Sequence, residues 1–129
     1  AQITITQNTS TSGSWLGAST NWNDPANWCG GVLPTASTNV NIPAGLTNYP
    51  VINTGATTPT PLCANLTIAT GARIDLQIGG KMIIHGTLTT TTGAVFNALD
   101  GTIEMAGSAP QTIAAGSFQN NNLRNLIGL

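Results

Sequence analysis

The chain has 129 residues, a formal net charge of −1 and only 5% charged residues, far below the roughly 25% of an ordinary soluble domain. Its length suits a single domain, and its three basic residues cannot form the positively charged surface that nucleic acids or anionic membranes require. We therefore expect no nucleic-acid partner and, because no apolar run approaches the ~18 residues of a membrane span, no membrane insertion.

The rest of the composition predicts an all-β fold. Hydrophobic residues make up 40% of the chain, which is too many for a disordered protein. Threonine, which is β-branched and favours strands, is abundant, and 15 glycines and seven prolines supply turns. No long segment combines a helical period of apolar residues with helix caps.

Residues 1–14 predict a strand followed by a flexible linker. Ile3 and Ile5 alternate with threonines, as in a half-buried strand, and residues 8–14 have the composition of a linker. A beginning at Ala1-Gln2 is typical of a mature chain after signal-peptidase cleavage, so we expect an exported protein.

The next segment, residues 15–61, is rich in tryptophan and does not repeat. All three tryptophans of the chain, Trp15, Trp22 and Trp28, lie close together near its beginning. Buried indoles would seal the end of a narrow core, whereas exposed indoles would stack on sugar rings. We favour a cap and keep a glycan-binding platform as the alternative. In a cap, backbone groups of the turns would be satisfied by the side chains of Asn21, Asn23, Asp24 and Asn27.

The two cysteines, Cys29 and Cys63, predict a disulfide in an exported chain. The bond would close a loop of about 34 residues, contribute roughly 3–4 kcal/mol, and fix the tryptophan segment to the start of the next segment. Two cysteines and a single histidine, His85, do not make a four-ligand metal site. We expect neither a metal nor a cofactor.

An internal repeat begins at residue 62 and extends through residues 62–129. The tripeptide Thr-Gly-Ala occurs at 70–72 and again at 92–94, and a frame bounded by glycines occurs at 80–86 and again at 101–107. A period of about 21 to 23 residues predicts a right-handed parallel β-helix of about three coils, in which each coil buries its apolar side chains against its neighbours. A β-sandwich is the alternative fold, with Asp100-Gly101 as its one hairpin signal.

The alternating pattern within the repeat predicts which side chains point into the core. The candidates are Leu66, Ile68, Ile74, Leu76, Met82, Ile84, Leu88, Val95, Ile103, Met105, Ile113, Leu123 and Leu126. After the last of them the sequence stays apolar and offers no segment that resembles a cap. The last residues therefore predict an open solenoid end that consists of Leu123, Leu126, Ile127 and Leu129.

Two groups of motifs carry a family resemblance. The first lies in residues 15–34, with Asn21-Trp22-x-Asp24 and Asn27-Trp28-Cys29; the second is the frame from Gly101 to Gly107, followed by Gln111-Thr112-Ile113. They resemble the N-terminal part of large secreted, adhesin-like surface proteins of Gram-negative gliding bacteria, which are exported by the type IX pathway. The resemblance implies β-solenoid coils after the tryptophan block and a place at the cell surface.

Catalytic chemistry has little support in the sequence. The acidic residues Asp24, Asp75, Asp100 and Glu104 form no clustered pair in the coil frame, and alternation places His85 on the outside. No serine nucleophile frame, phosphate loop or metal signature is present. We expect the protein not to be an enzyme.

The predicted function is structural. We expect a secreted scaffold module of the cell surface whose partner is a further copy of itself or further coils of its own chain. Head-to-tail contacts would join the open solenoid end of one copy to the strand with Ile3 and Ile5 of the next and would build a filament. The alternative is an adhesin module that binds glycans through the tryptophan cluster.

Overall fold

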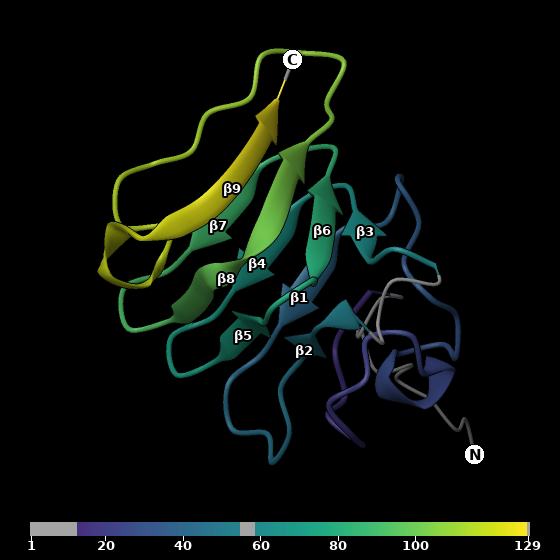
Figure 1. Ribbon diagram of the computed structural model, residues 1–129. Coiled ribbons are helices and arrows are strands. Elements are labelled where there is room, and N and C mark those ends of the chain that lie inside the picture. The colour runs from purple at the N-terminus through teal and green to yellow at the C-terminus, as the bar shows by residue number, and fades with distance from the viewer. Residues whose placement is uncertain (1–12, 55–58, 129) are drawn as a thin grey trace, which may run out of the picture.

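The computed structural model describes residues 13–54 and 59–128, which form a parallel β-solenoid of about four turns (Figure 1). Helix is nearly absent from this part of the chain, and includes the short 3₁₀ helices η1 (Pro25–Asn27) and η3 (Gln119–Asn121). The strands are β1 (Val40–Ile42), β2 (Val51–Ile52), β3 (Leu62–Cys63), β4 (Leu66–Ile68), β5 (Arg73–Leu76), β6 (Lys81–Ile84), β7 (Leu88–Thr90), β8 (Val95–Met105) and β9 (Leu123–Gly128).

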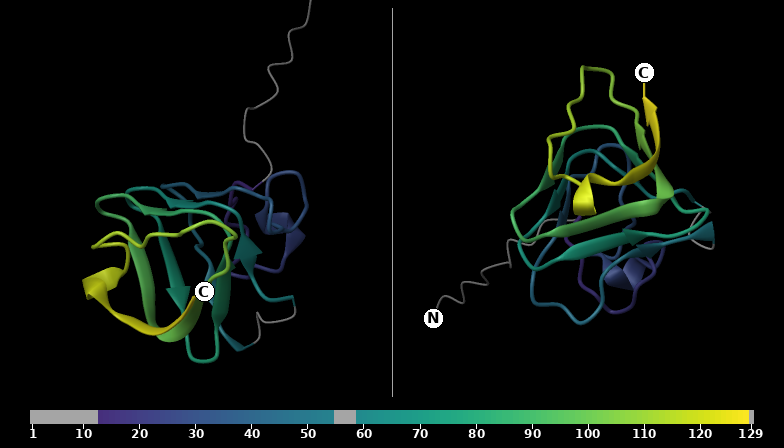
Figure 2. Two further views of the ribbon diagram at one scale, coloured as in Figure 1. Left: turned by 90° about the horizontal axis from the view of Figure 1, so that it is seen from above. Right: turned by 60° about the vertical axis from the view of Figure 1, so that its left-hand side comes forward.

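The strands stack into three faces. The first face contains β1, β4 and β7; the second contains β2, β5 and the beginning of β8; the third contains β3, β6, the end of β8, and β9. The long strand β8 continues around the corner between the second and third faces, so it pairs with β5 at one end and with β6 at the other. Figure 2 shows the coils stacked from the purple N-terminal segment to the yellow strand β9 at the opposite end.

The registers of the strands confirm the repeat. Leu66 pairs with Leu88, at the offset of the two Thr-Gly-Ala tripeptides, and Lys81 pairs with Thr102, at the offset of the two glycine frames. All pairs of named strands are parallel, so the β-sandwich alternative is wrong. Gly101 lies inside the unbroken strand β8, at the register shift between Ala98 and Thr102, and therefore not in a hairpin. A Cβ at Gly101 would lie 2.5 Å from Cβ of Leu76 in the neighbouring coil.

The solenoid begins earlier than the repeat in the sequence indicated. Strands β1 and β2, which lie within residues 15–61, pair with β4 and β5 and build a first coil together with β3. This coil raises the number of turns from the expected three to about four. Its loops are longer, since Val40 pairs with Leu66 at a wider offset than Leu66 with Leu88, and this departure from the repeat hid the coil in the sequence.

The core lies inside the stacked coils and contains most of the predicted inward side chains. Val95 is an exception: it is only partly buried, while Phe96 and Ala98 on the same strand point inward. The ring of Phe96 lies 5.2 Å from that of Phe118, a residue that no pattern in the sequence placed in the core. The inward positions that are confirmed as buried are Leu66, Ile68, Ile74, Leu76, Met82, Ile84, Leu88, Ile103 and Met105.

Candidate functional site: the two ends of the solenoid

The tryptophans form a closed cluster over the first coil. Each of Trp15, Trp22 and Trp28 is 1% exposed. Trp28 lies between the other two, with its ring centre 5.1 Å from Trp15 and 4.6 Å from Trp22, both in edge-to-face arrangements that favour aromatic pairs. Two indole N–H groups donate to backbone carbonyls, Trp15 to Asn48 at 2.8 Å and Trp28 to Trp22 at 2.7 Å. No indole face is exposed to stack on a sugar, so the glycan-platform alternative gains no support.

A buried asparagine holds the chain of the cap in place. Asn27 is fully buried, and its side-chain oxygen accepts a hydrogen bond from the backbone N–H of Ser19 at 2.7 Å. Its Nδ2 donates to Oγ of Ser19 and to the carbonyl of Asn21, both at 2.8 Å. Asp24 caps η1 by accepting from the backbone N–H of Ala26 at 2.9 Å. These polar side chains therefore satisfy turn backbone, as the sequence predicted.

The cap also covers the strand edges at its end of the solenoid. On the first face, Trp15 N donates to Asn41 O and Asn41 N donates to Gly13 O, each at 3.0 Å. On the second face, Val51 N donates to Thr20 O at 3.0 Å. Since an uncovered strand edge is a template for another chain, these bonds close two faces of this end to strand addition.

The expected disulfide is absent, although both cysteines lie within the described residues. Cys63 points into the core from β3, where it is fully buried and pairs in register with Ile84. Cys29 is half-buried and follows the last tryptophan of the cap. Desolvation raises the pKa of the Cys63 thiol to about 12. The cap is therefore held by packing and hydrogen bonds, and Cys63 serves as a small apolar core residue.

Among residues 13–54 and 59–128, no comparable cover lies over the opposite end. Strand β9 pairs with β8 on one side and with no other described strand (Figure 1). Leu126 continues the inward column of Ile103 but is 53% exposed, and Ile127 on the outward side is 47% exposed. Leu123 is partly buried against the core. Of the other predicted contact residues, Ile3, Ile5 and Leu129 lie outside the described residues.

An apolar hollow of about 650 Å³ opens beside β9. Its walls come from two sides, the segment 107–113 and the end of β9, with Met105 between them. Gly128 pairs with Met105 and so occupies an inward position without a side chain. The hollow therefore lies where an ordinary coil would place an apolar side chain.

The segment after β8 is held by Gln111, which stands in for a backbone peptide. Its Oε1 accepts from the N–H of Gly107 at 2.6 Å, while its Nε2 donates to the carbonyls of Ile84 at 3.0 Å and Gly86 at 2.7 Å. A Cβ at Gly107 would lie 2.6 Å from Cδ of Gln111, so the close approach requires glycine. The sequence offered one sign of this role, a glutamine shortly after the frame glycine.

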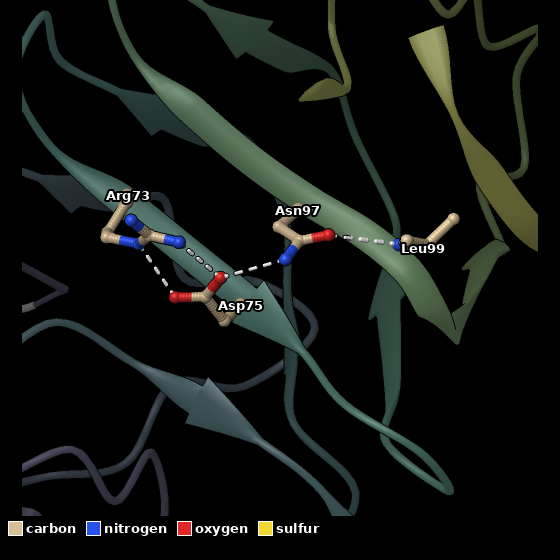
Figure 3. Close-up of polar contacts among 4 residues, drawn as sticks. All are labelled: Arg73, Asp75, Asn97 and Leu99. Atoms are coloured by element: carbon tan, nitrogen blue, oxygen red, sulfur yellow. Dashed lines mark hydrogen bonds and ion pairs between the residues drawn. The ribbon is translucent and has the colours of Figure 1, made fainter. Parts of the chain in front are cut away.

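The acidic residues each meet a separate partner. Asp75 accepts from Arg73 at 2.7 and 2.6 Å and from Asn97 at 3.2 Å, in a ladder across β5 and β8 (Figure 3). The amide oxygen of Asn97 in turn accepts from the N–H of Leu99 (Figure 3). This arrangement raises the pKa of Arg73, chiefly through its hydrogen bonds to Asp75.

The remaining acidic residues and the histidine also take part in local contacts. Glu104 lies 2.6 Å from Lys81, and Asp100 lies 3.9 Å from Arg124. His85 is half-buried, with Nδ1 3.2 Å from the carbonyl of Ala106. Within residues 13–54 and 59–128, no three of the His, Cys, Asp and Glu side chains gather as metal ligands, and no helix is long and apolar enough to cross a membrane.

Residues 14–106 match the model of a family described as a domain of unknown function, DUF8693. The chain belongs to this family. No curated protein and no solved structure matches the chain. The part shared with DUF8693 contains the cap and the strands β1 to β8, and it ends before β9. The open end is therefore built by a segment that the family model does not cover.

Proposed function

We propose that this DUF8693 chain is a non-catalytic structural module of an extracellular, cell-surface scaffold, which assembles head-to-tail through its open solenoid end. The observation that carries the proposal is the difference between the two ends. One end has buried tryptophans and strand edges closed by hydrogen bonds, whereas at the other end β9 has an edge that no described strand covers, with half-exposed Leu126 and Ile127.

Unequal ends favour an open assembly. A contact between two different surfaces of identical chains does not close on itself unless its rotation forms a ring, so it propagates as a filament. The open end supplies one of these surfaces. The strand predicted around Ile3 and Ile5 supplies the other, because an extended segment with alternating apolar residues adds readily to a free sheet edge.

The proposed location rests on the sequence. The charged fraction of 5% and the resemblance of the tryptophan block to secreted surface proteins favour an exported scaffold. The non-catalytic role is supported by the acidic side chains, since Asp75, Asp100 and Glu104 each pair with a basic residue on the solenoid surface. None of these pairs combines two carboxylates at the spacing that glycoside hydrolysis requires.

The proposal is tested with the full-length chain and two charge variants. We expect the unsubstituted chain to form fibres that are visible by electron microscopy and to scatter light increasingly with concentration. The double variant Ile3→Asp/Ile5→Asp should remain monomeric, whereas the matched control Thr4→Asp/Thr6→Asp, which changes the other face of the strand, should still assemble. An unsubstituted chain that stays monomeric at high concentration refutes assembly.

A further inference from the structure

The hollow beside β9 has two walls that are fastened separately. One wall, the segment 107–113, is held by the side chain of Gln111, which makes three hydrogen bonds to backbone groups, two of them at the end of β6 and just after it. The other wall is the end of β9, which pairs in register with β8. Because each wall is tied to its neighbouring coil, the fold itself sets the shape of the hollow, as it does in most small-molecule sites.

Small residues create the space within the hollow. Gly128 occupies the inward position beside Met105, and Gly107 and Ala109 lie on the other wall. A Cβ added at Gly128 would find no heavy atom within 4 Å. The space beside this glycine can therefore accept further atoms without displacing the described part of the chain.

The lining of the hollow favours a neutral, apolar occupant. Among the described residues, the lining contains no charged side chain, and its polar side chains are those of Ser108 and Gln111. Both N–H groups of the Gln111 amide already donate to backbone carbonyls, so the hydroxyl of Ser108 is the main side-chain group left for a ligand. A charged ligand would lose its hydration against this lining without gaining a partner. The large apolar side chains of the lining are Met105, Pro110, Ile113 and Leu126.

We propose that the hollow binds a small, neutral, largely apolar molecule, whose apolar body packs against Met105 and Leu126 and whose polar group meets Ser108. The volume of about 650 Å³ lies within the range of about 300–1,000 Å³ that is usual for small-molecule sites. Leu126 is 53% exposed, so a bound molecule would remove apolar surface from water there. This inference goes beyond the proposed assembly and stands without it, because it concerns a single chain.

Titration of the full chain with N-phenyl-1-naphthylamine tests the site. This neutral, apolar molecule becomes fluorescent when it leaves water, and the titration is made at chain concentrations where light scattering shows single chains. We expect saturable binding of one molecule per chain. Added 1-octanol should displace the fluorescent molecule, whereas octanoate at neutral pH should not, because its carboxylate would be buried without a partner.

Two leucine variants on β9 locate the binding. Gly128→Leu places a side chain in the hollow and should raise the Kd for the fluorescent molecule by at least about tenfold. Asn125→Leu adds the same side chain on the outward side of β9, in register with Thr102, and should leave the Kd within about twofold. Thermal unfolding shows whether each variant remains folded.

A truncated wall gives a second measure that does not depend on the leucine in the hollow. Leu126→Ala removes apolar contact from a half-exposed position, so the fold should tolerate the change. The loss of this contact should raise the Kd by at least about threefold. A Kd that does not change in Leu126→Ala contradicts the proposed contact.

The results separate this site from other apolar surfaces and from assembly. Equal Kd values for Gly128→Leu and Asn125→Leu, or binding that does not saturate, would show attachment to the outer surface and overturn the proposal. Equal displacement by 1-octanol and octanoate overturns the neutral ligand class. Fluorescence that rises only when the chains assemble places the apolar site between copies and overturns a site in the single chain. A chain that binds the fluorescent molecule but forms no fibres refutes assembly and leaves this site standing.

Discussion

Replacement of Trp28 by alanine tests whether the tryptophan cluster is a structural cap. The ring is 1% exposed, contacts Trp15 and Trp22 edge-to-face, and donates a hydrogen bond to the carbonyl of Trp22. Removal of a buried tryptophan side chain costs about 3–5 kcal/mol, including its packing contacts. The carbonyl of Trp22 loses its partner at an additional cost of about 1 kcal/mol. We therefore expect Trp28→Ala to lower the free energy of unfolding by about 4–6 kcal/mol.

This loss is large for a chain of 129 residues, whose total stability is roughly 6–19 kcal/mol at the usual value per residue. Urea unfolding followed by circular dichroism measures it as a lower midpoint with an unchanged slope. Leu16→Ala is the matched control, because its side chain is 49% exposed next to Trp15 and should change the stability by no more than about 0.5 kcal/mol. A loss below about 1 kcal/mol for Trp28→Ala would refute the cap, since a sealed cluster cannot lose its central ring at so small a cost.

Three further predictions concern the coils. Gly101→Ala should lower the stability by about 1–3 kcal/mol in urea unfolding, because its Cβ would lie 2.5 Å from that of Leu76, and a midpoint equal to that of the unsubstituted chain contradicts the tight corner. Burial raises the pKa of the Cys63 thiol from 9.0 to about 12 in the folded chain. Between pH 9 and pH 12 the unfolded chain therefore loses this proton while the folded chain keeps it, and the free energy of unfolding falls by about 1.4 kcal/mol per pH unit; below pH 9 the full contribution is present. Urea midpoints between pH 8 and pH 11 should therefore decline more steeply for the unsubstituted chain than for Cys63→Ala, and parallel declines argue against a buried thiol. Gln111→Ala should cost about 2 kcal/mol and accelerate amide exchange at Gly107, whose N–H loses its acceptor; unchanged exchange would show that the glutamine does not hold this turn.

The repeated coils were predictable because they impose their period on the sequence. Gly71 and Gly93 both have positive φ and lie one coil apart, with the N–H of Gly71 donating to the carbonyl of Gly93. Such positions strongly favour glycine, so a stacked corner leaves a regular mark. The first coil carries the same mark at Gly45, whose φ is also positive and which precedes Gly71 by the offset that joins Val40 to Leu66. That offset is wider than the one between the later coils, because the loops of the first coil are longer, so Gly45 did not stand out as part of the repeat.

Other errors came from patterns that are locally ambiguous. In β8 the residues Val95 and Phe96 are both apolar, and alternation alone did not show which of them points inward. The two cysteines suggested a bond from composition, but a pairing depends on where the side chains point, and Cys63 faces the core. The hollow was invisible in the sequence, since it arises from the pairing of Gly128 with Met105 across two coils.

A closed dimer is the strongest competitor of the filament. Two copies that face each other with their open ends would also cover β9 and bury Leu126, and equal surfaces that meet in this way form a dimer that does not grow. That arrangement gives the strand with Ile3 and Ile5 no role, so Ile3→Asp/Ile5→Asp would leave it intact, while Leu126→Asp would disrupt it. The filament instead needs both surfaces and is lost with either variant. The particle mass of the unsubstituted chain separates the two arrangements directly, because a dimer stops at twice the mass of the chain and a filament continues to grow with concentration.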